Sequence, residues 1–100
     1  MAEETAGAAP FEYDPEKSQT NRLKHGIDFD AVLELWNDPF AIEMTGRSDT
    51  ESRSIAIGQI EGKIWSVVFT LRGDKIRIIS ARRARKNEEM AYEKNIGRRI

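Results

Sequence analysis

The chain has 100 residues, of which 39% are hydrophobic and 33% are charged. This length supports one domain with a modest core, and the composition is typical of a soluble globular protein. Cysteine is absent, which excludes disulfide bonds and thiol nucleophiles and is compatible with a reducing cytoplasm. A single histidine without thiol partners nearly excludes a structural zinc site, so we expect no metal and no cofactor.

The net charge of −1 conceals an uneven distribution along the chain. Residues 1–51 carry twelve acidic and four basic side chains, whereas residues 72–100 carry ten basic and four acidic ones. A basic C-terminal third favours an anionic partner such as nucleic acid. A solvated basic helix explains the same charges equally well, so charge alone does not decide between them.

The N-terminal part of the chain predicts a tail, a short strand and a helix. Residues 1–10 are small and acidic, lack the basic and apolar regions of a signal peptide, and are expected to form a flexible tail. The alternating stretch FEYD, residues 11–14, indicates a strand. Asp14 can cap the helix that follows, with Pro15 in its first position and Gly26 at its left-handed end.

A second helix is predicted from Asp28, its N-cap, to Pro39, which ends it. Its apolar residues have i, i+3, i+4, i+7 spacing, which is typical of one buried face. They are Phe29, Val32, Leu33 and Trp36. Residues 45–52, TGRSDTES, are polar throughout and are expected to form a loop.

Three strands and a final helix are predicted in the second half of the chain. The strands cover residues 53–60, 64–72 and 75–81, with turns at Gly62 and at Gly73-Asp74. The helix covers residues 82–95, which lack proline and glycine. The order β-α-α-β-β-β-α indicates an α+β fold with helices packed on an antiparallel sheet. We expect one domain over residues 11–96 and a C-terminal tail over 97–100.

The hairpin formed by the last two strands indicates where its basic side chains point, because residues paired across a hairpin share a face. With Gly73-Asp74 as a two-residue turn, Arg72 pairs with Lys75 and Thr70 pairs with Arg77.

The preceding hairpin adds another arginine to the same face. With Gly62-Lys63 as its turn, Arg53 lies opposite Arg72 and Trp65 lies opposite Ile60. One face of the sheet is then apolar and covered by helices: Trp65, Val67, Phe69, Leu71, Ile76 and Ile78.

The other face gathers cations without an acidic residue among them: Arg53, Arg72, Lys75 and Arg77. Like charges on facing positions weaken a sheet by tenths of a kcal/mol up to about 1 kcal/mol. Because arginine offers a planar fork that holds two phosphate oxygens, we predict an anion site on this face. Charges that protect a sheet edge from aggregation are the alternative explanation.

His25, the only histidine, lies at the end of the first helix beside Lys24. A helix C-terminus favours positive charge, and this effect alone explains both residues. The functional alternative is acid–base catalysis, since imidazole ordinarily titrates near neutral pH.

An arginine-lined face with one imidazole is sufficient for RNA cleavage without metal. The ribose 2′-hydroxyl is the nucleophile, arginines stabilise the charged phosphorane, and His25 or Lys24 transfers protons. Arg82, placed at the end of the sheet, could assist at the scissile group. Tyr92 either packs in the interior or stacks on a base, and Glu88 and Glu89 are expected to pair with Arg85 or Lys86 on the helix surface.

Three segments together resemble the BrnT family of type II toxin–antitoxin toxins over about residues 11–93. They read F-E-Y-D-P, N-x-x-K-H-G-I-x-F and R-I-I-S-A-R-x-A. The resemblance implies a RelE-like fold and a ribonuclease that blocks translation. It also implies a BrnA-type antitoxin that inhibits the toxin and makes the DNA contacts, so that DNA is bound only indirectly.

Site residues follow from the matched segments. Lys24 and His25 match the K-H-G segment, and four arginines match the remaining basic positions: Arg53, Arg72, Arg77 and Arg82. Two other functions are alternatives to a ribonuclease. One is a non-catalytic module that binds nucleic acid or a partner protein. The other is a DNA-binding repressor, which is weaker because no pair of recognition helices is evident.

Overall fold

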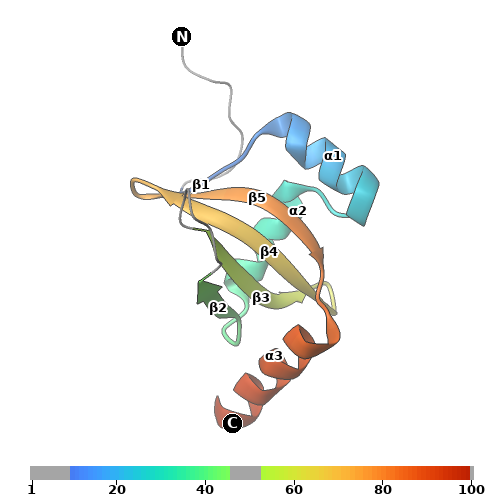
Figure 1. Cartoon of the computed structure of the whole chain (residues 1–100), viewed down its shortest axis with the longest axis vertical. Helices are drawn as coiled ribbons and strands as arrows, with labels where there is room; N and C mark the ends of the chain where they lie inside the picture. The colour runs from blue at the N-terminus through green and yellow to red at the C-terminus, as the bar shows by residue number, and fades with distance from the viewer. Residues whose placement is uncertain (1–9, 46–52, 100) are drawn as a thin grey trace.

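A computed structural model describes residues 10–45 and 53–99 (Figure 1). The predicted N-terminal tail and polar loop therefore lie almost wholly outside the described residues. The described elements, in chain order, are β1 (Phe11–Glu12), α1 (Pro15–His25), α2 (Phe29–Val32), η1 (Leu33–Asn37), β2 (Ile42–Thr45), β3 (Ser54–Ile60), β4 (Lys63–Arg72), β5 (Lys75–Arg83) and α3 (Lys86–Arg99). None of the helices in these ranges is long and apolar enough to cross a membrane.

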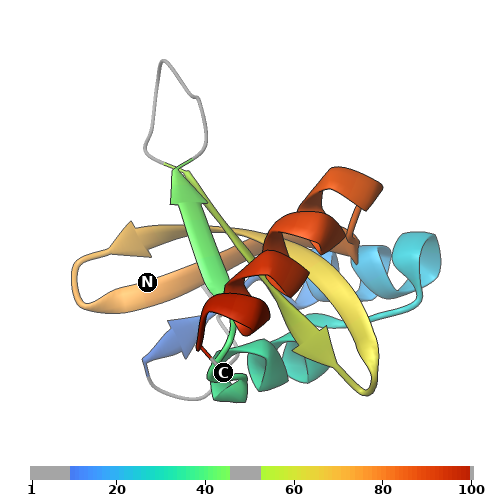
Figure 2. The same ribbon diagram turned by 90° about the horizontal axis from the view of Figure 1, so that it is seen from below.

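The strands form one sheet in the order β1-β5-β4-β3-β2 (Figures 1 and 2). The predicted α+β class is confirmed, but the predicted order omitted β2, which pairs antiparallel with β3. The prediction of a purely antiparallel sheet was also wrong, because β1 pairs parallel with β5. β2 has only four residues and lies at the sheet edge, so it carries little pattern of its own and depends on its pairing with β3.

Helix α1 begins and ends as predicted. The Asp14 carboxylate accepts a hydrogen bond from the backbone N–H of Glu16 at 2.9 Å, and Gly26 has the left-handed φ of 82°. Polar contacts hold this helix in place. Asn21 is buried, donates to the carbonyl of Ile27 at 2.9 Å, and accepts from the backbone N–H of Ala81 in β5 at 3.1 Å. The helix therefore lies along the edge of β5 beyond the short strand β1.

The second predicted helix is shorter and tighter than expected. Asp28 caps it as predicted by accepting from Ala31 N–H at 2.9 Å, but the α-helix ends at Val32 and continues as the 3₁₀ helix η1. Both helices pack on one face of the sheet and build the core there. The buried core consists of Tyr13, Ile27, Phe29, Val32, Leu35, Ala56, Ile60, Trp65, Val67, Phe69, Ile78 and Ala81.

The predicted helix-covered face of the sheet is correct except at its tip. Trp65, Val67, Phe69 and Ile78 are buried, whereas Leu71 is 67% exposed. The hairpin of β4 and β5 projects past α2 and η1 (Figure 1), so neither helix reaches Leu71.

Gly58 in β3 allows η1 to pack closely on the sheet. A Cβ atom at this position would lie 2.9 Å from Leu35 Cγ and 3.1 Å from Ala41 Cβ. We expect Gly58→Ala to lower the free energy of unfolding by about 1–3 kcal/mol, because the core must shift to admit the methyl group. Urea denaturation measures this, with Gly97→Ala as the control.

Gly97 lies in α3, where a Cβ atom would meet nothing within 4 Å. Gly97→Ala should therefore stabilise the helix by up to about 1 kcal/mol. A Gly58→Ala variant as stable as the wild type would contradict the close packing of η1 on β3.

The last helix begins later than predicted. Strand β5 continues to Arg83, which pairs with Trp65, and α3 runs from Lys86 to Arg99 instead of from residue 82 to residue 95. Arg82 therefore lies on a strand. Two arginines that suit a helix in isolation are held in the sheet by pairing with β4, since tertiary pairing outweighs propensity.

Candidate functional site

The basic face of the sheet forms with a register different from the predicted one. The turn between β3 and β4 is Glu61-Gly62, with φ of 48° and 79°, so that Ile60 pairs with Lys63. The predicted Arg53–Arg72 pairing was therefore wrong. Ser54 pairs with Phe69, which places the preceding Arg53 next to Thr70.

The predicted register of the β4–β5 hairpin is confirmed near its turn. Arg72 pairs with Lys75, and Thr70 pairs with Arg77. Because side chains alternate along a strand, Thr70, Arg72 and Arg77 point away from the face that α2 and η1 cover.

Three of the predicted arginines line a hollow of about 480 Å³ on this face. We call it the arginine hollow, and its lining residues are Lys17, Arg53, Thr70, Leu71, Arg72, Arg77 and Ile79. Lys75, predicted to join the cluster, lies at the exposed hairpin turn and is not among them. Lys17 was not singled out from the sequence, although it lies seven residues before Lys24 on the same helix face.

An acidic side chain lies beside the arginines, contrary to the prediction. The parallel pairing of β1 with β5 sets Glu12 beside Arg77. One Glu12 carboxylate oxygen lies 3.8 Å from Arg72 Nε, and the other lies 3.8 Å from Arg77 Nη1. Arg77 Nη1 is buried and has no hydrogen-bond partner within residues 10–45 and 53–99. The carboxylate therefore reduces repulsion between the two cations while leaving a donor of Arg77 unused.

Lys24 and His25 line an adjoining hollow between α1 and β5, which we call the histidine hollow. Its lining residues are Lys17, Thr20, Asn21, Lys24, His25, Ile79 and Ser80. Lys17 and Ile79 line both hollows, so the two are neighbours on the surface. The structure thus brings five of the six predicted site residues to adjoining hollows, and the exposed imidazole of His25 lies in the second.

Arg82 lines neither hollow. Its guanidinium donates to both carboxylate oxygens of Glu88, at 2.7 Å and 2.9 Å. These bonds hold the pKa of Glu88 below its ordinary value and raise the pKa of Arg82. The principal partner of Glu88 is therefore Arg82, contrary to the predicted pairing with Arg85 or Lys86. Glu88 also accepts from the backbone N–H of Arg85 at 2.8 Å, which secures the start of α3.

Tyr92 is a packing residue of α3. It is buried, and its hydroxyl donates to the Asp38 carboxylate at 2.5 Å. Burial and this bond raise the pKa of Tyr92. Asn95 donates to the carbonyl of Phe40 at 2.8 Å, so polar contacts attach α3 to the segment between η1 and β2. Tyr92 therefore lies away from the two hollows, and the packing alternative is confirmed.

The Arg82–Glu88 pair predicts a pH-dependent contribution to stability. Because the folded-state pKa of Glu88 is lowered, its stabilisation is present above the ordinary carboxyl pKa and is lost as pH falls through the folded value. We expect Glu88→Gln to reduce the free energy of unfolding by about 1–3 kcal/mol at pH 7, and by less as the solution becomes more acidic. Urea denaturation from pH 7 to pH 3 measures both effects.

Glu93→Gln is the matched control, because Glu93 is exposed on the same helix. It removes the same charge and should leave stability nearly unchanged. An equal effect of both substitutions at every pH would contradict a specific role for the pair.

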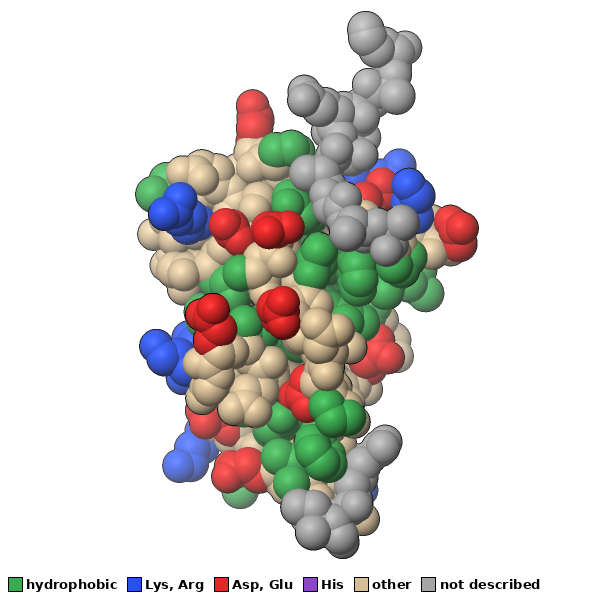
Figure 3. All heavy atoms as spheres, turned by 180° about the vertical axis from the view of Figure 1, so that it is seen from behind, with side chains coloured by type: hydrophobic (Ala, Val, Ile, Leu, Met, Phe, Trp, Pro, Cys, Tyr) green, Lys and Arg blue, Asp and Glu red, His purple; other side chains and the backbone are tan. Residues whose placement is uncertain are grey.

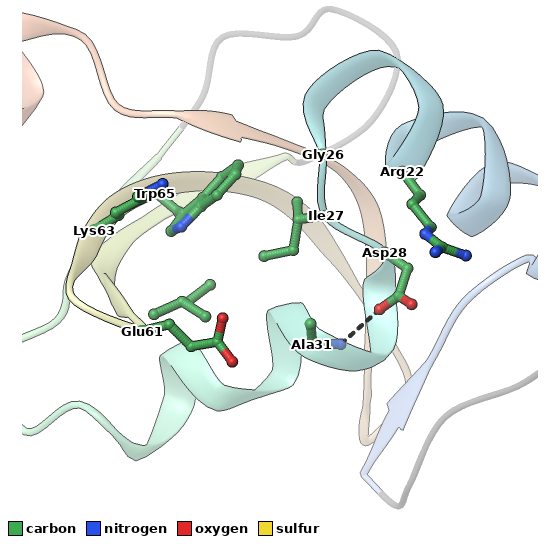
Figure 4. A pocket seen from close by; sticks show the side chains of 9 residues that line it. Arg22, Gly26, Ile27, Asp28, Ala31, Glu61, Lys63 and Trp65 are labelled. Carbon is green, nitrogen blue, oxygen red and sulfur yellow. Dashed lines mark hydrogen bonds between the residues drawn. The ribbon is translucent and has the colours of Figure 1, made fainter.

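A third hollow lies on the other side of the C-terminal end of α1 (Figure 4). Two basic residues, Arg22 and Lys63, line it, but so do the carboxylates of Asp28 and Glu61, and Asp28 caps α2 there. Acidic side chains also gather over the surface seen from behind (Figure 3). The two carboxylates balance the two cations, whereas, among the described residues, four basic ones and no acidic one line the arginine hollow, so the arginine hollow is the better anion site.

The fold and the two hollows define a small α+β domain with a basic face beside an accessible histidine. The family model described as "Ribonuclease toxin, BrnT, of type II toxin-antitoxin system" matches residues 13–88, and the chain belongs to this family. The predicted resemblance to the BrnT family is thereby confirmed. Comparison with curated proteins gave no match.

Proposed function

We propose that this chain is a metal-independent endoribonuclease that cleaves RNA, inhibits translation in the cytoplasm, and has a RelE-like fold. One observation carries the proposal beyond the family description. Arg53, Arg72 and Arg77 line one hollow, His25 lines the next, and Lys17 and Ile79 line both. Phosphate-binding forks and a proton-transferring side chain therefore share one surface.

In the proposed reaction, the ribose 2′-oxygen attacks the adjacent phosphorus, and the bond to the 5′-oxygen breaks. The 2′-hydroxyl loses a proton, and the departing 5′-oxygen gains one. His25 or Lys24 transfers these protons. Arg53, Arg72 and Arg77 bind the phosphate and stabilise the charge that develops on it. Arg82, held by Glu88, contributes only through the strand it shares with Arg77.

The proposed partner is a BrnA-type antitoxin that neutralises the toxin by binding it. The family description supports an antitoxin in general terms, since a type II toxin is paired with an inhibitory protein. We assign DNA binding to that partner. The basic side chains of the two hollows lie on a sheet and along its edge instead of on a recognition helix in the arrangement that reads a major groove.

Incubation of the purified protein with RNA in EDTA tests the proposal. Cleavage that leaves 2′,3′-cyclic or 3′-phosphate ends supports the enzyme, because those ends retain the attacked phosphorus. RNA with 2′-O-methyl groups is the control and should remain intact, since it lacks the nucleophile. Retention of RNA without cleavage would support the non-catalytic binding module instead.

A further inference from the structure

Ile79 occupies an irregular position in strand β5. Val68 pairs with Ser80 and Phe69 pairs with Ile78, so Ile79 has no partner in β4. An additional residue of this kind is a β-bulge, which turns a side chain away from the regular alternation and occurs frequently beside active sites. Here the bulge lies where the arginine hollow meets the histidine hollow.

The Ile79 side chain is apolar in a polar setting. It is half-buried, lines both hollows, and does not belong to the hydrophobic core or to the partly buried residues packed against it. Leu71 borders the arginine hollow but pairs with Ile76, and its side chain lies on the opposite face of the sheet. A single exposed apolar residue is ordinary. Ile79 differs because it lies at a bulge where two hollows lined by basic side chains meet, and the core does not explain it.

The residues around Ile79 indicate what its side chain contacts. The guanidinium groups of Arg53, Arg72 and Arg77 would be sufficient to bind a phosphate group alone. A nucleotide also carries a base, whose face is apolar and can pack on side chains next to the bound phosphate. Such packing also fixes where the attached ribose lies, and the ribose carries the 2′-hydroxyl that must approach His25.

We propose that Ile79 is a base-contacting platform that positions one nucleotide of the RNA between the arginines and His25. This inference rests on the proposed ribonuclease function. It adds a substrate-binding residue to the site and requires a base next to the phosphate that is cleaved. Ile79→Ala should lower kcat/KM for RNA cleavage roughly tenfold, through the apolar contact that is lost.

An abasic substrate tests the contact directly. The cleavage position in a short RNA is mapped first, and a ribose without a base is then placed on either side of that position. Wild-type protein should cleave one abasic RNA roughly tenfold more slowly than the intact RNA. In Ile79→Ala the same abasic site should have little further effect, because residues in contact are not additive.

Two control variants accompany Ile79→Ala, whose native fold is checked by circular dichroism. Leu71→Ala removes an exposed apolar side chain from the opposite face of the sheet. Leu23→Ala removes one from α1, where Leu23 is 79% exposed and lines neither hollow. Both should retain the full abasic penalty.

An abasic penalty that is equal in the wild type and in Ile79→Ala would overturn the platform while leaving the ribonuclease intact. Absence of cleavage by the wild-type protein on every RNA would overturn the proposed function and the platform with it.

Discussion

Arg77→Ala is expected to lower kcat/KM for RNA cleavage by about a hundredfold or more, the range found when one donor to a charged transition state is removed. Arg77 is the less exposed of the two arginines that pair with Glu12, with 17% of its side chain exposed against 53% for Arg72. Arg77 lines the arginine hollow, where its guanidinium would donate to a bound phosphate oxygen. Cleavage assays with defined RNA measure the loss.

The loss of cleavage activity should depend on where the removed arginine lies, not only on the loss of one positive charge. Arg98→Ala removes the same charge from an exposed site on α3 that lines neither hollow, and it should retain nearly full activity. Arg77→Lys keeps the charge but loses the planar fork, so an intermediate loss is expected.

Arg72→Ala should act in the same direction as Arg77→Ala and relieve growth arrest in cells, with a native circular dichroism spectrum. Arg72 is 53% exposed, so its removal costs little stability. Equal losses in Arg77→Ala and Arg98→Ala would mean that the arginine hollow has no special part in cleavage.

The part of this site that could be predicted from the sequence is the part governed by local turns. The two-residue turn at Gly73-Asp74 sets the pairing of Arg72 with Lys75 and of Thr70 with Arg77, because a short turn leaves one register. The bulge at Ile79 could not be read from the sequence, since an additional residue in a strand has no distinctive pattern there.

The β3–β4 turn shows why a wrong register can still give the right face. Glu61, a residue without glycine's freedom, adopts a positive φ of 48°, and the turn is one residue earlier than predicted. Moving a turn by one residue moves each pairing by two positions, so Arg53 keeps its face and gains a different neighbour.

Contacts between segments that are far apart in the sequence account for the features of the site that could not be predicted. Glu12 approaches the arginines because β1 pairs parallel with β5, and a two-residue strand carries no signal of its partner. Arg82 was expected near the scissile group because it follows a strand-like run, whereas Glu88 holds it instead. Ion pairing between neighbouring elements is decided by packing, which periodicity does not reveal.

His25→Ala is expected to reduce the rate of cleavage by about 10²- to 10⁴-fold, the contribution typical of one positioned acid or base. His25 lies in the hollow next to the arginines, at the C-terminal end of α1. Growth arrest should be relieved with a native circular dichroism spectrum. If His25→Ala and Arg72→Ala both remain fully toxic, the assignment of this site fails.

His25→Arg separates catalysis from the helix-end effect that also explains the residue. Arginine remains protonated, so it keeps the favourable charge at the C-terminus of α1 and can attract RNA, but it does not exchange a proton near neutral pH. We therefore expect His25→Arg to bind RNA as tightly as the wild type and to cleave as slowly as His25→Ala. Should His25→Arg cleave at the wild-type rate, the imidazole is a capping charge and Lys24 becomes the remaining candidate for proton transfer.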